Sequence, residues 1–176
     1  SQVSEEITSV EINEINFPDD TFRIFIRENF DNDYDDVLSA EEITAVTEIY
    51  VNKKGISDLS GLKYFINLRA LYCTDNQLTS LDVSNNTALA EIKCNGNQLT
   101  TLDVSNNRAL LWVHCKDNQL TSLDISNNSK MEELRCDNNQ LTTLDVSKNT
   151  ALTGLYCDGN QITTLDVSKN TSLFDL

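Results

Sequence analysis

Hydrophobic positions repeat at a fixed spacing through most of the chain. The segment LRALYCTDNQLTSLDVSNN, residues 68–86, recurs in register four more times, and each copy follows the last by 21 residues. Apolar residues occupy the same places in every copy, in the pattern L-x-x-L-x-C-x-x-N-Q-L-x-x-L-D-V-S-x-N. A strict period of this length is typical of a solenoid, in which each repeat forms one coil and stacked coils bury one another's apolar side chains.

The first half of each repeat predicts a short β-strand. Leu71 and Cys73 alternate with Tyr72, so a strand here buries two side chains and exposes one. The second half, L-D-V, alternates in the same way and predicts a second short strand on another side of the coil. The other apolar positions that we expect in the core are Leu68, Leu78, Leu81 and Val83.

An asparagine follows the first strand of every repeat. At this turn an asparagine side chain can bond backbone groups of its own coil and of the neighbouring coil. We therefore expect a ladder of structural asparagines along the stack, and we assign no catalytic role to it. Its members are Asn76, Asn97, Asn118, Asn139 and Asn160.

The cysteines are expected to be buried, free thiols. Adjacent coils stack about 4.8 Å apart, and in-register side chains run parallel, so their Cβ atoms lie too far apart for a bridge. The odd number of cysteines would leave one unpaired, and no CxxC-like spacing indicates zinc. They then act as small hydrophobic residues in the core. The column comprises Cys73, Cys94, Cys115, Cys136 and Cys157.

The repeat resembles the bacterial leucine-rich repeat of the internalin type, in the variant in which cysteine replaces one leucine. The resemblance implies an α/β-type solenoid that is mostly β, a right-handed coil with parallel strands and a helical N-terminal cap. It also implies an extracellular or bacterial cell-surface location, with adhesion or recognition of a protein or glycan through the concave face of the repeats.

The repeats are expected to occupy residues 46–176, after a lead-in and cap at residues 1–45. Val46, Ile49 and Val51 stand 22 residues before their counterparts in the next coil, so the first coil begins at Val46. The last coil stops at Leu176 in mid-strand, without a cap. We expect a piece of a longer protein, or a monomer that makes end-to-end contact there.

The cap is expected to contain a helix. Ser1–Asn16 is an acidic, partly ordered lead-in, and Pro18, Asp19 and Asp20 favour a helix start. The next apolar residues fall at helical spacing and predict a face that covers the open end of the solenoid. These residues are Phe22, Phe25, Ile26 and Phe30.

The segment DNDYDDVLSAEE, Asp31–Glu42, resembles the 12-residue calcium loop of an EF-hand. Asp36 departs from the pattern, because it stands where the loop needs glycine for a left-handed turn. The alternative is an acidic turn in which Ser39 and Glu42 form a capping box for the following helix. The predicted Ca²⁺ ligands are Asp31, Asp33, Asp35, Val37, Ser39 and Glu42.

Charge and motifs narrow the function classes. The chain of 176 residues fits one domain, and its net charge of −15 argues against nucleic acid and anionic membrane as partners. No apolar run is long enough for direct membrane insertion. We predict no enzyme: G-x-S-x-G, phosphate-loop and HExxH motifs are absent, and His114 and Cys115 point to opposite faces of a strand. A glycosidase pair of Glu91 and Glu133 remains a remote alternative.

The outward strand positions vary between repeats, unlike the scaffold positions. Aromatic and arginine side chains, which interface hot spots favour, gather there. The alternatives are a merely solvated sheet face and a structural spacer that binds nothing itself. The predicted ligand-binding residues of the concave face are Tyr72, Lys93, Trp112, His114, Arg135 and Tyr156.

Overall fold

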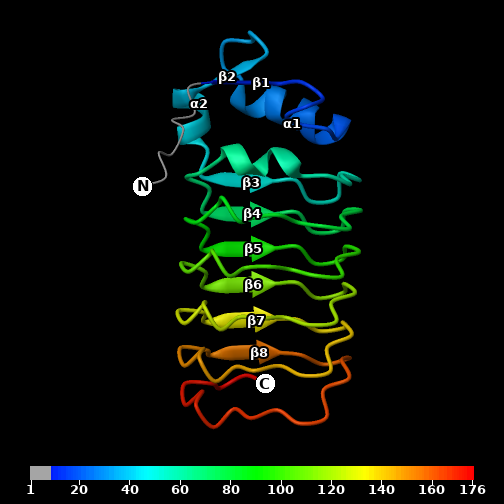
Figure 1. The fold of residues 1–176 in the computed structure, drawn as a ribbon, viewed down its shortest axis with the longest axis vertical. Helices are drawn as coiled ribbons and strands as arrows, with labels where there is room; N and C mark the ends of the chain where they lie inside the picture. The colour runs from blue at the N-terminus through cyan, green and yellow to red at the C-terminus, as the bar shows by residue number, and fades with distance from the viewer. Residues whose placement is uncertain (1–8) are drawn as a thin grey trace.

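The computed structural model describes residues 9–176, in which coils stack along one axis below an N-terminal cap (Figure 1). Each coil contributes one strand to a six-stranded sheet in which consecutive strands pair in parallel. The strands are β3 (Glu48–Tyr50), β4 (Ala70–Tyr72), β5 (Glu91–Lys93), β6 (Trp112–His114), β7 (Glu133–Arg135) and β8 (Gly154–Tyr156). The predicted solenoid of parallel strands is confirmed.

The register of the sheet aligns the repeated positions from coil to coil. Leu71 lies opposite Ile49 on one side and Ile92 on the other, and all three side chains are fully buried. Leu68, Leu78 and the cysteines of the inner coils are also buried, so one continuous apolar core runs along the stack. No coil could bury these side chains alone, and the stacking of coils is therefore what stabilises the fold.

The asparagine ladder predicted after each strand is confirmed. Asn97 Nδ2 donates to the carbonyl of Cys94 in its own coil and of Cys73 in the preceding coil, each at 3.0 Å. Its Oδ1 accepts the backbone N–H of Leu78, also at 3.0 Å. Each ladder asparagine thus satisfies buried backbone groups of two coils that the turn leaves without backbone partners.

The second strand predicted at L-D-V is wrong. Leu81 and Val83 are buried and Asp82 is exposed, as the alternation requires, but residues 81–83 form no strand. Side chains bond the backbone here instead: Asp82 Oδ1 accepts the N–H of Ser84 at 2.9 Å, and Asn107 Nδ2 donates to the Val83 carbonyl at 2.9 Å.

A second asparagine ladder, which the sequence analysis did not identify, runs along this side of the stack. Asn107 Nδ2 also donates to the backbone carbonyl of Asn86, its counterpart in the preceding coil, at 2.9 Å. The same two bonds recur one coil further along at Asn128. The members, all buried, are Asn86, Asn107, Asn128, Asn149 and Asn170.

All five cysteines carry free thiols, in the predicted column. Cys73, Cys94, Cys115 and Cys136 are fully buried, and burial raises the pKa of the Cys94 thiol to about 12. Cys157 is only partly buried, contrary to expectation. It directly follows β8, the last strand of the sheet, where no further strand of residues 9–176 covers it.

The cap combines two helices with a two-stranded ribbon. In the ribbon, β1 (Ser9–Glu11) pairs antiparallel with β2 (Val37–Ser39), so part of the predicted lead-in is a strand. Residues 1–8 of the lead-in lie outside the described residues. The helices are α1 (Asp20–Phe30) and α2 (Ala40–Ala45), and the 3-10 helix η1 (Ser60–Tyr64) belongs to the first coil.

The cap packs on the first coil through its aromatic residues, as predicted. Phe22 and Ile26 of α1 are fully buried, and Phe17 places its ring 6.1 Å from Phe22 and 6.4 Å from Phe65 of the first coil. Asp19 caps the N-terminus of α1: its side chain accepts the N–H of Phe22 at 3.0 Å. Apolar packing and this cap bond together close the N-terminal end of the stack.

Candidate functional site

The outward-pointing side chains of β3–β8 form two parallel columns, which we call the sheet face. The strand register brings together all six predicted binding residues, five of them in a central column and Trp112 in the flanking column. The central column is Tyr50, Tyr72, Lys93, His114, Arg135 and Tyr156, and the flanking column is Glu48, Ala70, Glu91, Trp112, Glu133 and Gly154.

At the cap end of the sheet face, two tyrosines stack. The rings of Tyr50 and Tyr72 lie 4.5 Å apart at an interplanar angle of 7°. Lys93 Nζ lies 5.1 Å from the centre of the Tyr72 ring and 2.7 Å from Glu91 Oε1. The Tyr72 hydroxyl donates to Glu91 Oε2 at 2.5 Å. Burial and this bond to a carboxylate raise the pKa of Tyr72, so its hydroxyl remains a donor.

At the other end, a carboxylate joins a histidine and an arginine. Arg135 Nε donates to Glu133 Oε1 at 2.6 Å, and the Arg135 guanidinium lies 4.3 Å from the centre of the Tyr156 ring. His114 Nε2 is buried 3.0 Å from the same Glu133 oxygen and makes no hydrogen bond. Burial lowers the pKa of His114 despite Glu133, so the imidazole is neutral at pH 7.

Trp112 separates these two groups of side chains. It lies opposite Glu91 on one side and Glu133 on the other, and it is 37% exposed. An amphipathic aromatic residue held at the middle of a polar face is a typical anchor for a ligand.

The glycosidase alternative finds no support in this geometry. A general acid needs a raised pKa, but the pKa of Glu91 is lowered: burial opposes the shift, and bonds from Lys93 and Tyr72 outweigh it. Glu133 is bonded to Arg135. The two carboxylates are therefore neutralised by cations of the sheet face itself.

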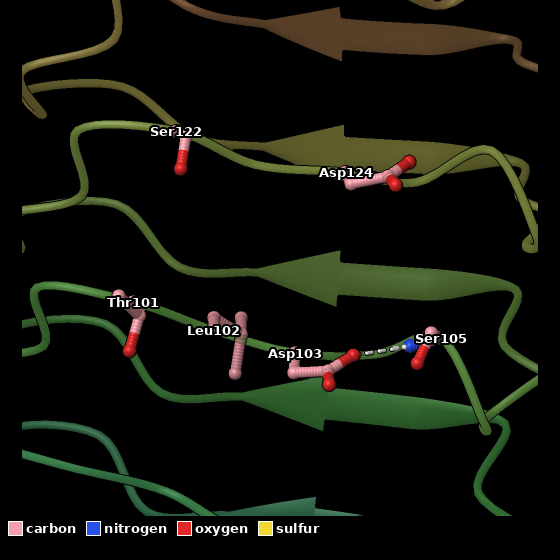
Figure 2. A pocket seen from close by; sticks show the side chains of 6 residues that line it. All are labelled: Thr101, Leu102, Asp103, Ser105, Ser122 and Asp124. Carbon is pink, nitrogen blue, oxygen red and sulfur yellow. Dashed lines mark hydrogen bonds between the residues drawn. The ribbon is translucent and has the colours of Figure 1, made fainter.

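Small pockets also lie between coils on the L-D-V side. Figure 2 shows one of about 350 Å³, where Thr101 and Asp103 of one coil neighbour Ser122 and Asp124 of the next. Asp103 Oδ1 accepts the N–H of Ser105 at 2.9 Å, and this bond recurs in the other copies of the repeat. The carboxylates here have a structural role, and the repetition of these residues gives the pockets no distinguishing chemistry.

The predicted calcium loop gathers its acidic residues. Carboxylate oxygens of Asp31, Asp33 and Asp35 lie within 4.8 Å of one another. Asp36 adopts the left-handed conformation required at its position, with φ of 63°. Desolvation and the nearby charges of Asp35 and Glu42 raise the pKa of Asp33, as expected for carboxylates that crowd together.

The capping-box alternative is also realised in this loop. Glu42 Oε2 accepts the N–H of Ser39 at 2.9 Å, and Ser39 Oγ accepts the N–H of Glu42 at 3.3 Å. Val37 and Ser39 both lie in β2. The oxygen donors fit a hard cation such as Ca²⁺ by type, and Glu42 would have to exchange its present bonds for the metal. Calcium binding stays a prediction.

The fold and the repeat define a leucine-rich repeat solenoid, and comparison with known proteins narrows this class. Over 71 residues, 40% of this chain, it is 39% identical to internalin J of Listeria monocytogenes serotype 4b (strain F2365) and 40% identical to internalin J of serovar 1/2a (strain ATCC BAA-679 / EGD-e). The matched part is 8% of the length of each of these relatives.

Solved structures extend the likeness to nearly the whole chain. The functional domain of internalin J from Listeria monocytogenes, described as including a cysteine ladder, matches 96% of this chain and 47% of its own at 30% identity, with a TM-score of 0.66. Internalin C2 from Listeria monocytogenes matches 96% of this chain and 87% of its own at 20% identity, with a TM-score of 0.69, which supports the fold alone.

These relatives and the fold support the prediction of an internalin-type leucine-rich repeat protein with a cysteine ladder. A family model described as the LVIVD repeat also matches residues 71–94 and 109–135, less than a third of the chain. Within residues 9–176, no helix is long and apolar enough to cross a lipid bilayer.

Proposed function

We propose that this chain is a recognition module of an extracellular or bacterial cell-surface protein and binds a protein or glycan through its sheet face. The recognition that we propose would serve adhesion. We assign it no catalysis, no nucleic-acid partner and no direct membrane insertion.

The observation that carries the proposal is the contrast between scaffold and sheet face. Buried leucines, cysteines and asparagines repeat in every full coil, whereas from β4 to β8 the central column changes at each strand. A sheet face that only had to be solvated would gain nothing from placing tryptophan, arginine and tyrosines there. These residue types contribute most of the binding energy in protein interfaces. The similarity to internalins supports the same proposal.

One observation favours the alternative of a structural spacer. Charged side chains of the sheet face bond one another, as Glu91 does with Tyr72 and Lys93, and Glu133 does with Arg135. A ligand that displaced these bonds would have to replace them. Trp112 and Tyr50 keep large exposed surfaces, however, and offer contact area without breaking an ion pair.

The two functions are separated by a capture experiment. The chain is immobilised and exposed to host-cell and polysaccharide extracts, alongside a variant in which Tyr72, Trp112 and Tyr156 are replaced by alanine. We expect the wild-type chain to capture a partner and the triple variant to lose it while keeping its far-UV circular dichroism and melting behaviour. The matched control carries Tyr34→Ala and Ile15→Ala, which remove side chains of the cap that are each 82% exposed.

Two results would count against the recognition function. Capture that survives the triple substitution places binding outside the sheet face. Equal loss in the control variant indicates that the captured material adheres to exposed apolar side chains without specificity.

A further inference from the structure

A pocket of about 450 Å³ lies where the cap meets the first coil. Glu48 and Tyr50, which line it, are also the first members of the two columns, so the pocket is continuous with the sheet face. Its cap side comes from the end of α1, the acidic loop and α2. The residues that line it include Asn29, Phe30, Asn32, Glu42, Glu48 and Tyr50.

The Tyr50 ring has one free face. Tyr72 covers the face that points toward β4, because the two rings stack at 4.5 Å and 7°. β3 is the first strand of the sheet, so no strand among residues 9–176 covers the other side (Figure 1). Tyr50 is 52% exposed, and it lines the pocket. The pocket therefore has access to an aromatic face, the part of the ring that attracts cations.

Glu48 supplies an available carboxylate beside this ring. Its Oε2 accepts the Tyr50 hydroxyl at 2.6 Å. Among residues 9–176, no lysine, arginine or histidine forms an ion pair with Glu48, whereas Glu91 is paired with Lys93 and Glu133 with Arg135. Glu48 thus keeps acceptor positions that the other glutamates of its column use for a cation.

The neighbouring strands show the completed version of this arrangement. The Lys93 ammonium lies over the ring of Tyr72 and is bonded to Glu91, which also accepts the Tyr72 hydroxyl. Tyr50 and Glu48 also combine a ring, a hydroxyl bond and a carboxylate, here within one strand, but no lysine, arginine or histidine of residues 9–176 pairs with Glu48. The missing member is a positive charge.

We propose that this pocket binds the ammonium or guanidinium group of a lysine or arginine side chain presented by a protein ligand. The inference rests on the proposed function, in its protein-binding form. The cation would lie over the free face of Tyr50 and bond Glu48. Side-chain oxygens of Asn29 and Asn32 offer further acceptors, and the Phe30 ring offers an apolar wall for the methylene stem.

Glu42 contributes to the pocket in a different way. Its carboxylate accepts the N–H of Asn32 at 2.6 Å and the N–H of Ser39 at 2.9 Å, so both oxygens already have partners. Glu42 therefore adds negative potential to the pocket, while Glu48 forms the main bond to the cation. Glu42 also belongs to the predicted calcium loop, and the test is therefore made with a chelator present.

The test is a titration of the ¹⁵N-labelled chain followed by NMR at constant ionic strength. The probes are N-acetyl-lysine amide and N-acetyl-arginine amide, and N-acetyl-norleucine amide is the neutral control. We expect saturable shifts of the Glu48–Tyr50 and Asn32 amides with both cationic probes and none with the neutral one. Glu48→Gln and Tyr50→Leu should each weaken binding by roughly twofold to fivefold.

Glu41→Gln is the matched control, because it removes the same charge from an exposed position of α2 that does not line the pocket. Equal shifts with the neutral probe, absence of saturable shifts at Glu48–Tyr50, or equal weakening by Glu41→Gln and Glu48→Gln would overturn the proposal.

The capture experiment distinguishes this failure from failure of the proposed function. One outcome is that capture is lost in the variant with alanine at Tyr72, Trp112 and Tyr156 but unchanged in Glu48→Gln. That result would support the recognition function and refute the cation pocket. Weakened capture by Glu48→Gln with normal capture by Glu41→Gln is the result that the proposal predicts.

Discussion

Replacing Asn118 with alanine removes one step of the first asparagine ladder. Its Nδ2 donates to the carbonyls of Cys94 at 3.0 Å and Cys115 at 3.1 Å, and its Oδ1 accepts the N–H of Leu99 at 3.0 Å. The alanine variant leaves the buried Leu99 N–H without any partner. Such an orphaned donor costs about 1–3 kcal/mol.

The two carbonyls lose less, because each keeps a second asparagine. Cys94 still accepts from Asn97, and Cys115 still accepts from Asn139. Adding a net loss of about 0.5–1 kcal/mol for the pair of weakened acceptors gives a total destabilisation of about 1.5–4 kcal/mol for Asn118→Ala.

The assay is equilibrium unfolding in urea, followed by circular dichroism. The control is Asn106→Ala: Asn106 is exposed, donates only to the Ser84 carbonyl at 3.3 Å, and should change the free energy of unfolding by less than about 0.5 kcal/mol. If Asn118→Ala costs no more than Asn106→Ala, the ladder does not stabilise the stack and the argument from orphaned backbone groups is refuted.

Three other parts of the molecule give predictions. A thiol reagent should label Cys157 first in the folded chain and all five cysteines only after denaturation, and Cys115→Ser should lower the free energy of unfolding by about 1–3 kcal/mol in the same urea assay; rapid labelling of every thiol in the folded chain would contradict their burial. Millimolar calcium should raise the melting temperature, and Asp31→Ala or Glu42→Ala should abolish the rise; an unchanged melting temperature with and without chelator would reduce the loop to a helix-capping turn. The pKa of Asp19 lies below its usual 3.8, since bonds from Ser57 and Phe22 outweigh burial. Its carboxylate therefore stabilises the fold above pH 3.8, and this contribution is lost as the pH falls below that value. Asp19→Asn should make acid unfolding less steep, and an identical pH profile would refute this.

The repeat made most of the fold predictable. One 21-residue spacing relates all five cysteines, and in a solenoid that spacing fixes which residues stack. The bonds of Asn97 to two coils follow from its place at a turn that leaves backbone groups unpaired.

Backbone pairing at L-D-V was less predictable. Alternation correctly assigned Leu81 and Val83 to the core, but it reports side-chain direction and not the partner of each backbone group. The Asn107 side chain takes the Val83 carbonyl, a choice that depends on the distance to the next coil. Repetition of this asparagine in every repeat was the available signal for the second ladder.

The candidate site was predictable in position but not in its interactions. The strand register brings together Tyr72, Trp112 and Tyr156 on one face as the repeat requires. The spacing before β4 is 22 residues and the first coil lacks the full motif, so Glu48 and Tyr50 were not included among the predicted binding residues. Pairing of Lys93 with Glu91 depends on rotamers, which the spacing does not determine.

The central claim is that the sheet face makes the contact with a partner, and side-chain footprinting tests it most directly. Hydroxyl-radical labelling of the chain alone and with its captured partner should show Tyr50, Tyr72 and Trp112 protected by the partner. Tyr34 of the cap, 82% exposed, and Phe174 of the last coil, 84% exposed, should be labelled equally in both samples. Protection of those two residues together with unchanged labelling of Trp112 would contradict the account.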